Sequence, residues 1–296
     1  MVLGRLSCVE RRAVERGEEL RALRMLATRR ALAIRALRIP RLTASKIVAL
    51  LCVGATFAFA AQAAITDASR GALWKVVQAC LISHRLTGGA FPCLEVNVSS
   101  GDNRGYVILR PPFSASDLIL SPTRRIVGVE DPSLEALDAP NYFEDAWNAR
   151  KFLEDAPHEP LKHDGVVLAV NSRQSRTQDQ LHIHIGCLKS SAKRTIQAFA
   201  PALPTDRWVP LGRPFHGLEF WGRLFLGDNL AGVNPFRLAA EAWPNSAMDR
   251  SQLTIAVADV QLSHEREGFV LLASFQNTRG EHSIEDFLVG SARSCR

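Results

Sequence analysis

The sequence predicts an α+β fold, in which helices pack on one face of an antiparallel sheet. Apolar runs with the length of strands recur at 106–109, 118–120, 166–170, 181–188, 253–260 and 269–275. Segments with helical spacing of apolar residues lie at 141–153 and 235–243. This order of helix, two strands, helix, two strands is typical of a layered structure with helices over an antiparallel sheet.

Positive charge is concentrated in the first 46 residues. They hold twelve Lys or Arg and four Glu, a net of +8, whereas the whole chain carries +6. Residues 47–296 therefore carry −2, and this gives no support to nucleic-acid binding. The basic tail, 1–46, is either an amphipathic helix for an anionic surface or an over-long start ahead of Met25, and we prefer the second reading.

Residues 47–65 are an uncharged apolar run, near the length needed to cross a bilayer. Small residues that suit signal cleavage occur at 58–60 and 61–63, so a cleaved signal peptide and a retained signal anchor both stay open. In both cases the basic N-terminus keeps that end in the cytoplasm and the rest is exported. We therefore expect an exported domain, 66–296, that begins with a helix over 66–80.

Four cysteines lie in this exported domain, where two disulfides are expected. Cys80 and Cys93 flank a Gly/Pro loop and are the natural pair, which leaves Cys187 for Cys295. The alternative is four buried thiols, as in a cytosolic enzyme.

The turn after the strand 118–120 is basic. Pro122 is followed by Arg124 and Arg125, and Arg125 is the better candidate for a phosphate contact. The alternative is a solvated basic turn. The helix that follows, 141–153, places Phe143, Trp147 and other apolar residues on one face, so we expect Trp147 to anchor the core rather than to stack on a base.

The most informative stretch is 171–189, which begins after the buried run 166–170. Side chains alternate faces along a strand, so Leu181, Ile183 and Ile185 share the core face. His182 and His184 then share the other face, which we expect to be the solvent side.

The polar loop before these histidines carries Arg173, Arg176 and Thr177. Imidazole is nucleophilic near neutral pH, and guanidinium groups and hydroxyls stabilise the charge on phosphoryl oxygens. The pattern therefore suggests attack on phosphorus. Its alternatives are an edge pair of histidines or two zinc ligands.

Beyond residue 208, strand and helix patterns continue without a second pair of histidines. A degenerate second copy of the first unit stays open, although no internal sequence repeat is detectable.

Several motifs carry a resemblance to a known family. They are 105–109, 121–126, 141–143 with 147–150, 171–173, 176–178 with 182–185, and 269–273. The chain resembles the histidine-triad superfamily, with its His-x-His-x-His signature, and within it the bacterial CDP-diacylglycerol pyrophosphatases. The resemblance spans about residue 70 to the C-terminus, and it departs from the triad at one position, where Gln180 replaces the first histidine.

The resemblance implies a function and roles for the site residues. The reaction is hydrolysis of CDP-diacylglycerol to CMP and phosphatidate at the bacterial inner membrane, by a single-pass or secreted periplasmic domain with a histidine-triad-like fold. His182 is the nucleophile and His184 assists it. Substrate or phosphate contacts are assigned to Asn171, Arg173, Arg176, Thr177, Gln180 and Arg125. No metal or cofactor is required, and the expected partners are the lipid nucleotide and the membrane.

Two alternatives from other classes stay open. One is a hydrolase or transferase for soluble nucleotide conjugates. The other is an exported lipid- or nucleotide-binding protein that has lost turnover, with Gln180 as the trace of that loss. A zinc site is a weaker alternative, since His163, His216 and Glu219 are the only further ligand candidates.

Overall fold

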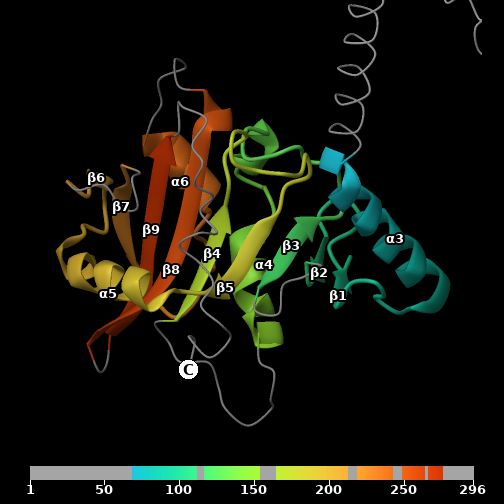
Figure 1. Cartoon of the computed structure of the whole chain (residues 1–296), viewed down its shortest axis with the longest axis horizontal. Helices are drawn as coiled ribbons and strands as arrows, with labels where there is room; N and C mark the ends of the chain where they lie inside the picture. The colour runs from blue at the N-terminus through green and yellow to red at the C-terminus, as the bar shows by residue number, and fades with distance from the viewer. Residues whose placement is uncertain are drawn as a thin grey trace, which may run out of the picture. The chain divides into compact units, whose positions relative to one another are not determined.

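A nine-stranded antiparallel sheet organises the domain (Figure 1), in the order β1-β2-β3-β5-β4-β8-β9-β7-β6. The computed structural model describes residues 69–111, 117–153, 165–212, 219–242, 249–263 and 266–275, all within one unit, 64–296. The strands are β1 (Glu95–Asn97), β2 (Tyr106–Leu109), β3 (Leu118–Pro122), β4 (Val166–Val170), β5 (Ile183–Cys187), β6 (Val209–Pro210), β7 (Trp221–Leu226), β8 (Leu253–Ser263) and β9 (Arg266–Phe275).

The basic tail and the apolar run 47–65 lie outside the described residues. A search of the described helices finds none with both the length and the apolar character of a membrane span.

Helices cover both faces of the sheet, so the expectation of helices on one face is wrong. The helices are α3 (Ala72–Thr87), α4 (Tyr142–Asn148), α5 (Ser190–Phe199) and α6 (Pro235–Ala242). α4 and α6 pack on one face, where Phe143 and Phe236 join the largest core cluster. α3 and α5 pack on the other face, over two separate clusters. Apolar residues on both faces of the strands explain this, because each face needs its own cover.

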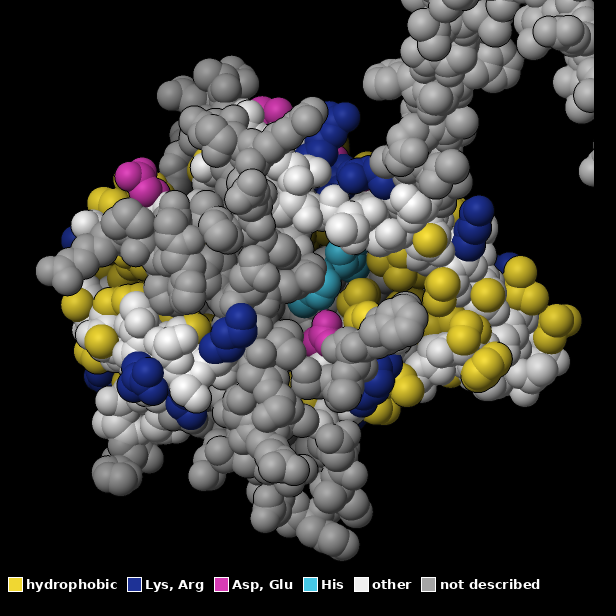
Figure 2. Space-filling model, in the orientation of Figure 1, with side chains coloured by type: hydrophobic (Ala, Val, Ile, Leu, Met, Phe, Trp, Pro, Cys, Tyr) yellow, Lys and Arg dark blue, Asp and Glu magenta, His cyan; other side chains and the backbone are white. Residues whose placement is uncertain are grey.

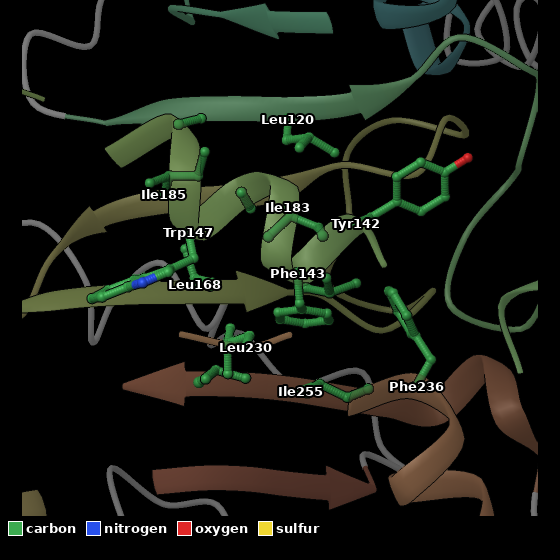
Figure 3. Close-up of a cluster of buried hydrophobic side chains, with 14 of the residues drawn as sticks. Leu120, Tyr142, Phe143, Trp147, Leu168, Ile183, Ile185, Leu230, Phe236 and Ile255 are labelled. Atoms are coloured by element: carbon green, nitrogen blue, oxygen red, sulfur yellow. The ribbon is translucent and has the colours of Figure 1, made fainter. Parts of the chain in front are cut away.

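The largest cluster lies between α4 and the middle of the sheet (Figure 3). Asn141 caps α4 by accepting a hydrogen bond from the Glu144 amide, and the helix turns into a 3-10 helix at Ala149–Leu153. Trp147 is 3% exposed and meets Phe269 edge-on, with ring centroids 4.9 Å apart. Its expected role as a core anchor is thus confirmed.

A disulfide joins Cys80 of α3 to Cys93 before β1, as expected. α3 runs seven residues beyond the expected end at residue 80, and it stops at Gly88, whose φ of 73° favours glycine. Cys187 is also disulfide-bonded. Its partner lies outside the described residues, so pairing with Cys295 stays a prediction.

The strand order supports the second copy that the sequence left open. The segment β2-β3-α4-β4-β5 gives the sheet order 2-3-5-4, and β6-β7-α6-β8-β9 gives 6-7-9-8. The copies meet where β4 pairs with β8, and Phe143 of α4 contacts Phe236 of α6 with ring centroids 5.1 Å apart. β9 takes the place of β5 but carries Val270 and Leu272 where β5 carries His184, so the histidines belong to the first copy alone.

Candidate active site

The two histidines lie in the middle of the sheet, at the gap between the clusters under α3 and α5. Ile183 and Ile185 point into the large cluster with Leu181, as the alternation predicted. His184 points to the other face, between Ile119 of β3 and Ala169 of β4. His182 lies beside it, with ring centroids 5.0 Å apart and the planes at 73°. Figure 2 shows histidine side chains in a recess of the face in view.

Polar residues lie just beyond or at the ends of four neighbouring strands, at the level of His182. Extending the register Ala169↔His184 by two residues would bring Asn171 opposite His182. The same extension would bring Ser121 opposite His182 on the β3 side, and Thr254 opposite Asn171 on the β8 side. All four side chains are at most 6% exposed. Cross-strand neighbours lie about 5 Å apart, so these extended registers would put Ser121 and Asn171 on the two sides of His182.

Backbone geometry selects the tautomer of His182. Its Nδ1 lies 2.7 Å from the carbonyl oxygen of Gln180. A carbonyl oxygen only accepts hydrogen bonds, so Nδ1 carries the proton and donates it. In the neutral ring Nε2 is then the nitrogen without a proton. His182 is therefore held in the form that attacks through Nε2.

Gln180 braces the segment before His182. It is fully buried, and its amide nitrogen donates to the carbonyls of Pro122 and Arg124, each at 3.1 Å. Two further bonds join the same segments, from the Leu181 amide to Ile126 and from the Ser121 hydroxyl to Leu181. Gln180 was expected to contact substrate or phosphate, and its amide nitrogen holds the two loops together.

The structure also places Arg176 away from the expected diphosphate clamp. Its side chain is 3% exposed, and its two terminal nitrogens each lie 2.7 Å from a Glu130 oxygen. Its Nε donates to Asp179 at 3.1 Å. Two carboxylates thus accept three hydrogen bonds from this buried guanidinium, so its charge is balanced inside the protein and it is poorly placed to clamp a phosphate.

Asp179 extends this network to α3. Arg70 holds both oxygens of Asp179 at 2.7 Å, and these bonds are the main reason that the pKa of Asp179 lies below its usual range. The Leu73 amide donates to Gln178 at 2.9 Å. The start of α3 is therefore fastened to the loop 171–180.

Comparison with known proteins identifies the family. The family model for CDP-diacylglycerol pyrophosphatase matches residues 68–292. A CDP-diacylglycerol pyrophosphatase of Yersinia pestis is 35% identical over 187 residues, which cover 63% of this chain and 70% of that protein. The chain belongs to the CDP-diacylglycerol pyrophosphatase family. It is therefore an enzyme of the hydrolase class.

The family match includes all the predicted site residues, and the structure divides them into three groups. His182 and His184 lie together at the centre of the sheet, and Asn171 directly follows β4, the strand that pairs with β5. Arg173, Thr177 and Arg125 are exposed on the two loops that border the histidine segment. Gln180 and Arg176 lie beneath these loops and hold them.

One expectation about the pyrophosphatase site is corrected. His182 and His184 are each only 6% exposed, so they lie in a hollow and not on an open solvent face. The described residues contain no group of three or more His, Cys, Asp or Glu arranged to hold a metal ion.

Sequence reasoning missed Ser121, Thr254 and Glu130. Ser121 and Thr254 are among the buried polar residues at these strand ends, and Glu130 holds Arg176. Ser121 could have been noticed in the sequence, since its hydroxyl ends the apolar run 118–120 and opens the motif 121–126. Nothing near Thr254 or Glu130 in the sequence indicates their partners, which lie 82 and 46 positions away.

Proposed function

We propose that the enzyme hydrolyses CDP-diacylglycerol to CMP and phosphatidate through a nucleotidyl-histidine intermediate on His182. The family and the Yersinia pestis relative support the substrate. The observation that supports the mechanism is the hydrogen bond from His182 Nδ1 to the Gln180 carbonyl, which leaves Nε2 as the nucleophile. Membership of the histidine-triad superfamily belongs to the same proposal.

In the first step, the lone pair on Nε2 attacks the phosphorus that bears the cytidine. A nitrogen–phosphorus bond forms, the bond from this phosphorus to the bridging oxygen breaks, and phosphatidate leaves with the electron pair. The Gln180 carbonyl stabilises the positive charge that the ring acquires, because it accepts from Nδ1 throughout. In the second step, water attacks the same phosphorus, and CMP leaves Nε2.

The neighbouring residues have roles that follow from their places. His184 faces the same hollow and donates to a phosphoryl oxygen or to the leaving oxygen. Asn171, which the extended register would bring opposite His182, orients the ring or the phosphate. Arg173, Thr177 and Arg125 supply cations and a hydroxyl from the exposed loops. Gln180 and Arg176 hold the loops in place instead of touching the phosphate.

We also propose that this chemistry takes place outside the cytoplasm, with the domain held at the inner membrane or released into the periplasm. The Cys80–Cys93 disulfide supports an oxidising compartment. Disulfides are rare in cytosolic proteins, where thiols are kept reduced.

Trapping the intermediate tests the mechanism. The full chain is mixed with CDP-diacylglycerol labelled at the phosphorus next to cytidine and quenched within one turnover. Label should appear on His182 in an acid-labile, base-stable bond, at up to one equivalent per chain. Substrate labelled in an acyl chain should leave none. Label on the wild type that persists in His182→Ala would refute the assignment.

A further inference from the structure

We propose that α3 and its disulfide loop form a surface that docks on an anionic phospholipid bilayer. The docking surface consists of Ile82, Leu86, Phe91 and Leu94. This inference rests on the proposed lipid substrate, because acyl chains in a bilayer require the enzyme to work at its surface.

The docking surface is exposed and local. Its members are 56%, 79%, 82% and 43% exposed in chain order, and they fall within thirteen positions. They are four of the eight large hydrophobic side chains that are exposed among the described residues; the others are Val127, Leu137, Trp221 and Leu226. Single exposed apolar residues are ordinary on a protein surface, whereas a group of this kind marks an interaction site.

α3 presents this surface because it is apolar on two opposite sides. Leu73, Val77, Cys80 and Leu81 face the core. Ile82 and Leu86, with Lys75 on the same stripe, lie on the opposite side of the helix. The αL turn at Gly88 reverses the chain, and the disulfide ties the loop to the helix, so Phe91 is held beside the end of α3.

The charge around the docking surface suits an anionic bilayer. Residues 69–94 contain no Asp or Glu and include Arg70, Lys75 and Arg85. Arg70 pairs with Asp179 and Arg85 with Asp102, so Lys75 supplies the local net charge. Anionic headgroups attract Lys75, and the apolar side chains insert at the boundary between headgroups and acyl chains, so the combination suits a bilayer surface.

The docking surface lies on the same side of the domain as the hollow with the histidines. Figure 2 shows hydrophobic side chains from the edge of that hollow across to α3. The amide of Leu73 is bonded to the loop before His182, and Ile82 lies nine residues further along the helix, about 14 Å at 1.5 Å per residue. This separation is within the reach of one lipid molecule, so the headgroup enters the hollow while the bilayer meets α3.

The test uses the full chain with Ile82, Leu86 and Phe91 each changed to Ser. Two substrates are compared: long-chain CDP-diacylglycerol in phosphatidylethanolamine/phosphatidylglycerol vesicles, and a short-chain analogue that is monomeric in water. We expect kcat/KM to fall at least tenfold on the vesicle substrate and less than twofold on the soluble one. The matched control is Leu137→Ser with Leu226→Ser, which should change neither. An unchanged kcat/KM on both substrates, or an equal loss of kcat/KM on both, would overturn the proposal.

A second measurement is independent of the chemistry. Leu86→Trp in the full chain, bound to the same vesicles, should be quenched more strongly by brominated lipid than the parent chain is. Leu137→Trp, at a residue that is 90% exposed, should be quenched no more than the parent. Equal quenching at both positions would overturn the docking surface. If the proposed hydrolysis fails, this result still decides whether α3 meets the bilayer.

Discussion

Glu130→Gln separates a structural role of Arg176 from a role in binding the diphosphate. The change removes one charge and retains the shape, so a guanidinium with a 3% exposed side chain keeps only Asp179 as a charged partner. Removal of one partner from a fully buried pair costs about 3–5 kcal/mol. Glu130 is 26% exposed and Asp179 stays charged, so we expect a smaller loss, about 2–3 kcal/mol of unfolding free energy.

Arg176→Met should give a similar loss, because it retains most of the buried aliphatic volume and strands Glu130. The two changes share one interaction, so the double variant should lose about 1–2 kcal/mol less than their sum. Gly128→Ala should act on the same pair, since a Cβ at Gly128 would lie 2.0 Å from an Arg176 terminal nitrogen.

Two measurements distinguish a structural role of Arg176 from diphosphate binding. Urea unfolding gives the free energy of unfolding, and an enzyme assay gives kcat and KM for the folded fraction. A loss of about 2–3 kcal/mol lowers the melting temperature by roughly 5–10 °C for a domain of this size. For a structural residue, kcat and KM of the folded fraction should change together, since the loop 171–180 is loosened. The structural role would be refuted if Arg176→Met unfolds within 0.5 kcal/mol of the parent but has a tenfold higher KM.

Three further predictions follow from the same contacts. Gln180→Ala should lower the free energy of unfolding by about 1–2 kcal/mol, because the carbonyls of Pro122 and Arg124 lose their donor. It should lower kcat less than His182→Ala, which should abolish turnover. Equal losses of kcat would contradict the bracing role of Gln180. Burial, with Glu144 and Glu95 nearby, raises the pKa of Asp145 to about 6. The folded pKa lies above the unfolded value, so the stability from this group is present below about pH 4 and is lost as the pH rises through 6. Asp145→Asn should therefore stabilise the domain by about 1–2 kcal/mol at pH 7.5, after allowance for its partial exposure, and have little effect at pH 4; an equal gain at both pH values would refute the cause. Cys80→Ala with Cys93→Ala should cost about 3 kcal/mol of unfolding free energy in urea, because the bond closes a loop over a sequence separation of 13. No loss would show that the unfolded loop is already constrained.

The sequence by itself determined what depends on neighbouring residues. Alternation with period two placed Ile183 and Ile185 in the core and the histidines on the opposite face, because side chains of a strand alternate whatever the strand pairs with. The spacing of Cys80 and Cys93 around a short loop likewise identified their disulfide.

Only the tertiary structure decided how each group is paired. Arg176 looked like a free cation in the loop sequence, but it meets Glu130 from 46 positions away. Gln180 looked like a substitute ligand, but its amide bonds to a loop 56 to 58 positions away, and its backbone carbonyl sets the tautomer of His182. Such pairings depend on which strands lie side by side in the sheet, and no local pattern encodes that order.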